Sequence, residues 1–364
     1  MVGLVAGLLH LGLALHGQSV ETLGGGRVTL LGPDYGFQDG NSKSEAQFNG
    51  PLGFALSAAG ELLVADRTNG AIRRMSLSSG TTTTVLPNFW RPTPLKQPVA
   101  LTLDTNNNFY ILTQGDGVII RFDKFDSLYR FPTTIVSGLP APTAFTFDQS
   151  TKTFYVTTLG GDIFRVHGET NGTEALAITD GGAPYKLKEP RGIALLESGL
   201  LVVSDTGANR LRFIEPANGV VVASAGTGTN DHRDGPFGLA MFNQPWQLAK
   251  TPLGSVVVAD RMNHRVRLLT ADGIVGTLYG VDQVFWQELC LDCDPIVLPG
   301  WFDGLGGPTG VAEARQPVGV FVDPAGVVYV SEDYYHIVRR LSGADLSGGG
   351  GATNLFVARP TLIP

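Results

Sequence analysis

Six copies of one pattern, each starting from a proline, constrain this 364-residue chain more than any other feature. The copies start at Pro51, Pro98, Pro142, Pro190, Pro245 and Pro317. The run that begins eleven residues after each proline is short and rich in β-branched or aromatic residues, such as LLVAD at 62–66 and VVVAD at 256–260. Such runs are typical of buried strands. The chain is therefore predicted to be a repeat protein built from strands.

The spacing of the copies indicates the kind of repeat. Successive prolines are 47, 44, 48, 55 and 72 residues apart, which is the range of four-stranded propeller blades. The fourth copy divides into the predicted strands Gly192–Leu195, Leu200–Ser204, Arg210–Ile214 and Val220–Ala223. A single sheet of this kind cannot bury both faces, so the copies should close into a ring. The predicted fold is all-β, a six-bladed β-propeller of four-stranded antiparallel blades over residues 18–345.

The two ends of the chain offer competing strands for closing this ring. Residues 1–17 contain an apolar run that is too short to span a membrane and is typical of a signal peptide. We therefore expect a protein that is secreted, periplasmic or held at the cell surface. Arg27–Leu31 and Asn354–Ala358 could each supply the outer strand of the last blade, and we favour Arg27–Leu31. Residues 346–364 are otherwise a glycine-rich tail.

Particular segments also resemble a known repeat. Phe242–Pro245 followed by Val258–Arg267 resembles the NHL repeat, and Ala65–Asn69 and Asn209–Arg212 are similar. The resemblance covers roughly residues 27–345 and implies a six-bladed propeller of the NHL or TolB-like type. Proteins of this type include protein-binding and RNA-binding platforms as well as lyases and hydrolases, so the resemblance alone assigns no activity.

An acid at one repeat position occurs only in those copies that also have an arginine at a second position. Four copies have an acid fifteen residues after the proline and an arginine seven residues later, whereas the other two have Thr113 with Ile120 and Thr157 with Phe164. Joint loss predicts contact, because one charge left alone in a partly buried sheet costs more than removing both. We expect four structural ion pairs, namely Asp66–Arg73, Asp205–Arg212, Asp260–Arg267 and Glu332–Arg339.

One face of the ring is predicted to carry the binding site. In an antiparallel blade, the linker that enters the first strand and the turn between the second and third strands emerge on the same face, here called the linker face. Long loops, aromatic residues and two histidines gather there. The candidate binding residues are Trp246, His264, Trp301, Phe302, Tyr334, Tyr335 and His336. Three linkers also contain an Asp-Gly pair, at 39–40, 234–235 and 303–304, which either makes a turn or contributes to a calcium site.

Other candidate chemistry is weaker. His264 and His336 share one repeat position, so we interpret them as turn-stabilising residues in preference to metal ligands. Cys290 and Cys293 are the two cysteines of the chain. They are too few for a four-cysteine zinc site and would form a loop disulfide in an exported protein. No nucleophile elbow, zinc-binding helix motif or phosphate loop occurs, so we predict no catalytic residue and no cofactor, with calcium or another divalent cation kept open.

Charge and motifs together suggest a binding role. The net charge is −7 and the basic residues are dispersed, which argues against a nucleic-acid partner. We predict an exported binding or scaffold module without chemistry of its own, whose partner is a protein or an extracellular polymer. The alternative is a metal-dependent hydrolase or lyase with its site at the central channel, as in the propeller enzymes that the chain resembles.

Overall fold

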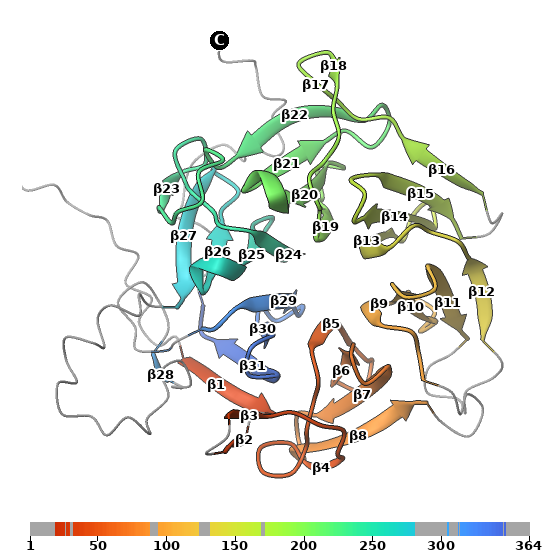
Figure 1. Ribbon diagram of the computed structural model, residues 1–364, viewed down its shortest axis with the longest axis vertical. Helices are drawn as coiled ribbons and strands as arrows, with labels where there is room; N and C mark the ends of the chain where they lie inside the picture. Colours follow the sequence, from red (N-terminus) through yellow and green to blue (C-terminus); the bar gives the residue numbers. More distant parts are fainter. Residues whose placement is uncertain are drawn as a thin grey trace, which may run out of the picture.

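The six copies form six sheets around one central axis (Figure 1). The computed structural model describes residues 19–25, 27–29, 32–87, 94–123, 132–168, 172–280, 304–305, 312, 314–344 and 346. Within this part of the chain, each blade has four antiparallel strands, with the first strand nearest the axis. The predicted six-bladed all-β propeller is confirmed. No helix in the same part is long and apolar enough to cross a membrane.

Each of the first three blades consists of four strands that are consecutive in the sequence. Blade 1 consists of β5 (Pro51–Leu56), β6 (Glu61–Asp66), β7 (Ala71–Ser76) and β8 (Thr81–Leu86). Blade 2 consists of β9 (Pro98–Leu103), β10 (Phe109–Thr113), β11 (Val118–Phe122) and β12 (Thr133–Val136). Blade 3 consists of β13 (Pro142–Asp148), β14 (Thr153–Thr158), β15 (Ile163–His167) and β16 (Thr173–Leu176).

The next two blades have short 3-10 helices after their second strands. Blade 4 consists of β19 (Gly192–Leu195), β20 (Leu201–Asp205), β21 (Arg210–Ile214) and β22 (Val220–Ala225), with η1 at Thr206–Ala208. Blade 5 consists of β24 (Pro245–Lys250), β25 (Val256–Asp260), β26 (Arg265–Leu269) and β27 (Ile274–Tyr279), with η2 at Arg261–Asn263. Blade 6 begins with β29 (Pro317–Val322), β30 (Val328–Glu332) and β31 (Ile337–Ser342).

The ring is closed from the N-terminal side. β1 (Ser19–Gly24) pairs antiparallel with β31 and forms the outer strand of blade 6. The prediction that Arg27–Leu31 closes the ring was wrong, because β2 (Arg27–Thr29) pairs with β3 (Gly32–Asp34) in a separate two-stranded sheet. Residues 1–17, Asn354–Ala358 and the C-terminal tail other than Leu346 lie outside the described residues.

Packing explains why β1 closes the ring. A bulge between Thr22 and Gly24 shifts the register of β1 against β31. Val20 packs into the apolar cluster between blades 5 and 6, whereas Leu23 packs into the cluster between blades 6 and 1. One short strand thus supplies an apolar residue to the interface on each side of blade 6, as an outer strand must.

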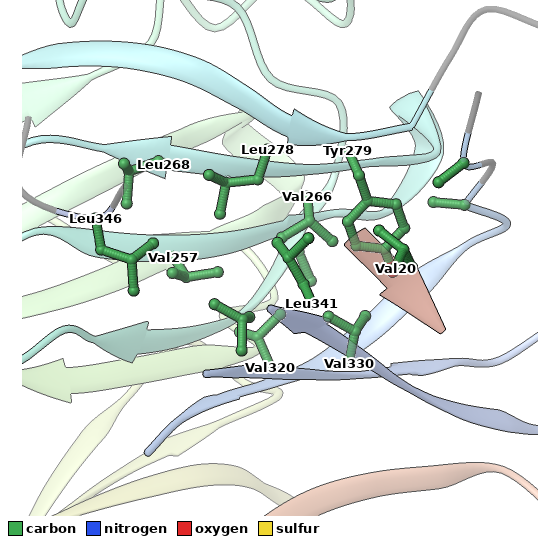
Figure 2. Close-up of a cluster of buried hydrophobic side chains, with 14 residues drawn as sticks. Val20, Val257, Val266, Leu268, Leu278, Tyr279, Val320, Val330, Leu341 and Leu346 are labelled. Carbon is green, nitrogen blue, oxygen red and sulfur yellow. The ribbon is translucent and has the colours of Figure 1, made fainter. Parts of the chain in front are cut away.

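Buried aliphatic side chains lie between neighbouring blades. Figure 2 shows the cluster in which Val257, Val266 and Leu278 of blade 5 face Val330 and Leu341 of blade 6. Five further clusters fill the other interfaces between neighbouring blades. Because every blade is covered on both faces, the second strands are buried along their whole length in blades 2 to 6, which explains their continuous apolar runs.

The innermost strands approach one another closely at the position two residues after the proline. A Cβ atom added to Gly53 would lie 2.6 Å from the Val99 carbonyl oxygen, and one added to Gly192 would lie 2.8 Å from the Gln247 Cα atom. Glycine is therefore required at these two positions. This close approach keeps the ring narrow at its centre.

Four buried arginine–carboxylate pairs link the second and third strands. The N–O distances are 2.9 Å in Asp66–Arg73, 3.1 Å in Asp205–Arg212, 2.8 Å in Asp260–Arg267 and 3.0 Å in Glu332–Arg339. At most 8% of any of these eight side chains is exposed. The structure therefore brings together every acid and arginine that the sequence pattern pairs.

The same arginines also hold the Asp-Gly linkers. Arg73 donates from Nη2 to Asp39 Oδ1 at 2.8 Å, and Arg267 donates from Nη2 to Asp234 Oδ1 at 2.6 Å. Each aspartate also accepts a hydrogen bond from a backbone N–H of the outer strand, that of Thr84 or of Thr277. The linker then continues as a short fifth strand, β4 (Gly40–Asn41) or β23 (Gly235–Pro236).

The remaining linkers show variations of this arrangement. In blade 4 the second carboxylate is Asp180, whose Oδ2 accepts a hydrogen bond from Arg212 Nη1 at 2.9 Å. Asp180 belongs to β17 (Thr179–Asp180), which pairs with β22 and with β18 (Ala183–Pro184). Before blade 6, β28 (Gly304–Leu305) pairs with β1 as a fifth strand, and Asp303 lies outside the described residues. The linkers before blades 1, 4, 5 and 6 are thus anchored to their own blades.

We predict strong coupling within one of these pairs. Asp260→Thr or Arg267→Ile alone should lower the free energy of unfolding by about 3–5 kcal/mol, because each leaves a buried charge without its main partner. The double variant reproduces Thr113 and Ile120 of blade 2 and should lose less than the sum, with a coupling of about 1–3 kcal/mol. Urea unfolding of the four proteins measures this coupling.

A surface pair provides the control. Lys250 and Glu197 lie 2.6 Å apart with side chains 48% and 78% exposed, so solvent screens their interaction and their coupling should stay below about 1 kcal/mol. Additive losses at Asp260 and Arg267 would contradict the prediction.

Candidate functional site

Three turns on the linker face latch neighbouring blades together. His264, His336 and Asn209 stand nineteen residues after their prolines and adopt left-handed backbone conformations, with φ of 54°, 55° and 53°. His264 Nδ1 accepts a hydrogen bond from the Gln316 N–H at 3.1 Å, and His336 Nδ1 accepts one from the Gly50 N–H at 2.9 Å. Asn209 Oδ1 accepts one from the residue before Pro245 at 2.8 Å. Each bond joins one blade to the next.

The two histidines are thus held as neutral bases. A ring nitrogen that accepts a backbone N–H bond carries no proton, so the proton must lie on Nε2. Burial lowers the pKa of His264, and the nearby Arg315, Arg261 and Arg265 guanidiniums add to this effect. Burial also lowers the pKa of His336. Both histidines therefore stabilise the rim in the way that their shared repeat position suggests.

A tryptophan lies at the mouth of the central channel on the linker face. Trp246 follows Pro245 directly and packs both against the cluster between blades 5 and 6 and against the cluster that contains Leu52, Val99 and Val318. The Arg191 guanidinium carbon lies 4.5 Å from a ring centroid of Trp246, and the Arg261 carbon lies 4.8 Å from one. The partly buried indole is thus flanked by two cations.

A third arginine completes the cluster at this mouth. Arg67 and Arg261 occupy the same repeat position, sixteen residues after the proline, and Arg191 comes directly after Pro190. Burial lowers the pKa of Arg191, the Glu189 carboxylate opposes this, and the charges of Arg67 and Arg261 add to it. Asp333 lies 3.3 Å from Arg67 and 3.9 Å from Arg261. We call Trp246, Arg67, Arg191 and Arg261 the channel mouth.

A second aromatic–arginine contact lies on the linker face in blade 6. Tyr334 is 42% exposed, and the Arg315 guanidinium carbon lies 4.2 Å from its ring centroid. Tyr335 packs edge-on against Tyr334 at 4.9 Å but is only 1% exposed. Tyr335 therefore supports the face from beneath and presents no contact surface, unlike the anchor that we predicted. Asp333 directly precedes Tyr334 and connects this region to the channel mouth through its ion pairs with Arg67 and Arg261.

Several predicted site residues are not placed by the structure. Trp301, Phe302, Cys290 and Cys293 lie outside the described residues. Conversely, the three arginines of the channel mouth were not among the predicted site residues. For Arg67 and Arg261 the available signal was repeat position sixteen, which reads Arg, Gln, Thr, Thr, Arg and Asp around the ring, unlike the uniformly aliphatic strand positions.

A separate cavity opens at the opposite end of the axis. It has a volume of about 780 Å³ and is lined by the ends of all six first strands. The residue three positions after each proline contributes to its wall, namely Phe54, Leu101, Phe145, Ile193, Leu248 and Val320. Gln247 donates from Nε2 to the Val99 carbonyl oxygen at 3.3 Å, which links blade 5 to the opposite blade 2 across the axis. None of the channel-mouth residues is among those that line the cavity.

The described part of the chain contains no group of three or more His, Cys, Asp or Glu side chains that could hold a metal ion. The acids near the axis have other partners. Asp104 and Asp323, at the ends of first strands, accept hydrogen bonds from the Tyr110 and Tyr329 hydroxyls at 3.1 and 3.3 Å. What the arrangement offers chemically is therefore aromatic surface and guanidinium groups at one end, and a cavity lined by both apolar and polar residues at the other.

We predict that the two histidines make stability depend on pH. Their lowered pKa values mean that the unfolded chain takes up protons first, so stability is complete above the unfolded pKa of about 6.5 and is lost as the pH falls towards the folded values. His264→Asn with His336→Asn copies Asn209 and should keep the latches. Thermal melts at pH 7.5 and 5.5 should therefore show a smaller loss of Tm in the double variant. An equal loss would contradict this role.

The known proteins that are similar to this chain share at most a quarter of their aligned residues with it. No protein-family model matches the chain. Among curated proteins, Protein SUPPRESSOR OF QUENCHING 1, chloroplastic, of Arabidopsis thaliana is 25% identical over 278 residues. The match covers 64% of this chain and 26% of that protein. The chain thus spans about a quarter of the length of the curated relative that it matches.

Two solved structures from Bacteroides thetaiotaomicron share the fold. One, described as a protein of unknown function, superposes with a TM-score of 0.69 at 18% identity and covers 89% of this chain and 75% of its own. The other, described as an auxiliary nutrient binding protein, superposes with a TM-score of 0.68 at 15% identity and covers 89% and 76%. Such identities show the fold alone. The chain is a six-bladed β-propeller that resembles NHL-repeat-like proteins.

Proposed function

We propose that the chain is an exported NHL-type propeller that acts as a binding module and that a protein or an extracellular polymer docks on its linker face. One observation carries this proposal. Trp246 is partly exposed at the channel mouth and held between Arg191 and Arg261. Tryptophan and arginine are the residue types that most often dominate binding energy at protein interfaces.

Tyr334 offers a second contact point on the same face. Its ring is 42% exposed, lies under the Arg315 guanidinium and rests on buried Tyr335. The turn that carries Tyr334 is also latched to blade 1 through His336. Side chains held in this way lose little conformational entropy on binding, which favours affinity.

The relatives support a binding role without assigning a ligand. The Bacteroides propeller described as an auxiliary nutrient binding protein has the same overall fold, so a ring of this size is suited to ligand binding. In our proposal the fold serves as a rigid disc, and the contacts come from side chains specific to this chain. We propose no catalytic step.

The test is binding to arrays of peptides and of extracellular polysaccharides. The unaltered protein should bind members of at least one array, and Tyr334→Ala should weaken that binding by about 30-fold, as expected for an aromatic anchor worth about 2 kcal/mol. The substitution removes a side chain that is 42% exposed, so the fold should survive, which a thermal melt checks.

A variant at the opposite end of the axis is the matched control. Lys250 lines the cavity there and has an exposed side chain, so Lys250→Ala should leave array binding unchanged. Binding that is lost in Lys250→Ala and kept in Tyr334→Ala would refute docking on the linker face.

A further inference from the structure

Arg191 is partly buried and differs from the four buried arginines that pair with a carboxylate. Arg73, Arg212, Arg267 and Arg339 each form an ion pair with a buried carboxylate. Within the described residues, Arg191 has no salt bridge and no side-chain hydrogen bond. Its contact is with the Trp246 ring at 4.5 Å. A partly desolvated guanidinium in this state lacks the anion that normally stabilises it.

The surroundings add positive charge to this position. Arg261 also contacts the Trp246 ring, at 4.8 Å. The charges of Arg261 and Arg67 both act on Arg191. Asp333 neutralises part of this charge, since it lies within 4.0 Å of both Arg67 and Arg261. Asp333 thus pairs with Arg67 and Arg261, whereas the carboxylate that acts on Arg191 is that of the exposed Glu189. This excess is local, because the whole chain carries a net charge of −7.

The arginines come from blades that surround the channel mouth. Arg191 directly precedes β19, the first strand of blade 4, whereas Arg67 follows the second strand of blade 1, the opposite blade. Arg261 comes from blade 5, next to blade 4. Cations from several blades therefore converge on one point of the axis, and a ligand bound there would contact several blades at once.

We infer that Arg191 anchors an oxyanion subsite at the channel mouth, which binds a carboxylate or phosphate group of the ligand while Trp246 supports the adjoining part of that ligand. The inference rests on the proposed function, since it specifies the chemistry of the docking face. The planar guanidinium presents two parallel N–H groups, which match the two oxygens of a carboxylate or phosphate. Arg67 and Arg261 strengthen the attraction without occupying the same position.

The probes for the test are inorganic phosphate, succinate and the neutral analogue succinamide, added to the full chain at constant ionic strength. Either phosphate or succinate should raise the Tm and give a saturable calorimetric signal, whereas succinamide should do neither. A response to succinate alone assigns a carboxylate, and a response to phosphate alone assigns a phosphate group. Binding of neither anion at 10 mM would overturn the inference.

Variants separate this subsite from general charge effects. Arg191→Gln should weaken anion binding at least tenfold and abolish the rise in Tm, and Arg191→Lys should give an intermediate loss because it keeps the charge without the planar fork. Arg74→Gln is the matched control, because Arg74 is a half-exposed arginine in the third strand of blade 1. Unchanged anion binding in Arg191→Gln would overturn the inference.

The outcome is distinguishable from failure of the proposed function. Removing an unpaired, partly buried charge should leave the Tm of Arg191→Gln without probe equal to or above that of the unaltered protein, so loss of binding will not reflect unfolding. If array binding depends on Tyr334 but not on Arg191, the docking face stands and the oxyanion subsite fails. If array binding depends on neither residue, both proposals fail.

Discussion

The buried arginine–carboxylate pair is the interaction on which the arrangement of the linker face depends. An acid at the end of the second strand fixes an arginine of the third strand, and the arginine then reaches the linker that precedes the blade. In blades 1 and 5 the same guanidinium bonds two carboxylates and two or more carbonyl oxygens, as with Arg73 on Asp66, Asp39, Gln47 and Gln38. A long loop is thereby held against a sheet by an arginine side chain that solvent does not reach. Arginine suits this task because its several N–H groups serve many acceptors at once.

Much of this fold could be predicted because six copies in one chain act as comparisons for each other. Two of the four strands expected in the fourth copy match the structure, and Leu201–Asp205 and Val220–Ala225 differ only at their ends. The acid–arginine pairs were visible because two copies lacked both partners. The prediction of the closing strand was wrong because β1 lies before the first proline and is not part of any of the six copies. Its position depends on how Val20 and Leu23 fill the interfaces on the two sides of blade 6.

The candidate site was harder to predict for a related reason. Repetition identifies what the blades share, whereas a ligand contacts what distinguishes them. Arg191 occupies a position where the other copies have Leu52, Val99, Thr143, Trp246 and Val318, and no local pattern shows that it meets Arg67 of the opposite blade. Tyr335 illustrates the converse, because an aromatic residue in a surface turn was expected to be exposed and instead packs in the interior. Such convergence across the axis depends on ring closure and on side-chain direction, neither of which periodicity specifies.

Closure by β1 has a consequence for the order of folding. Glu21 contacts Arg340, and these residues are 319 positions apart in the chain. Blade 6 therefore stays incomplete until almost the whole propeller has been synthesised, while β1 waits without a partner. Proteins dominated by such distant pairings fold slowly, and an unpaired strand edge invites association with other chains. During synthesis β1 and the edge of β31 are thus open to such association, although in the finished ring they cover each other.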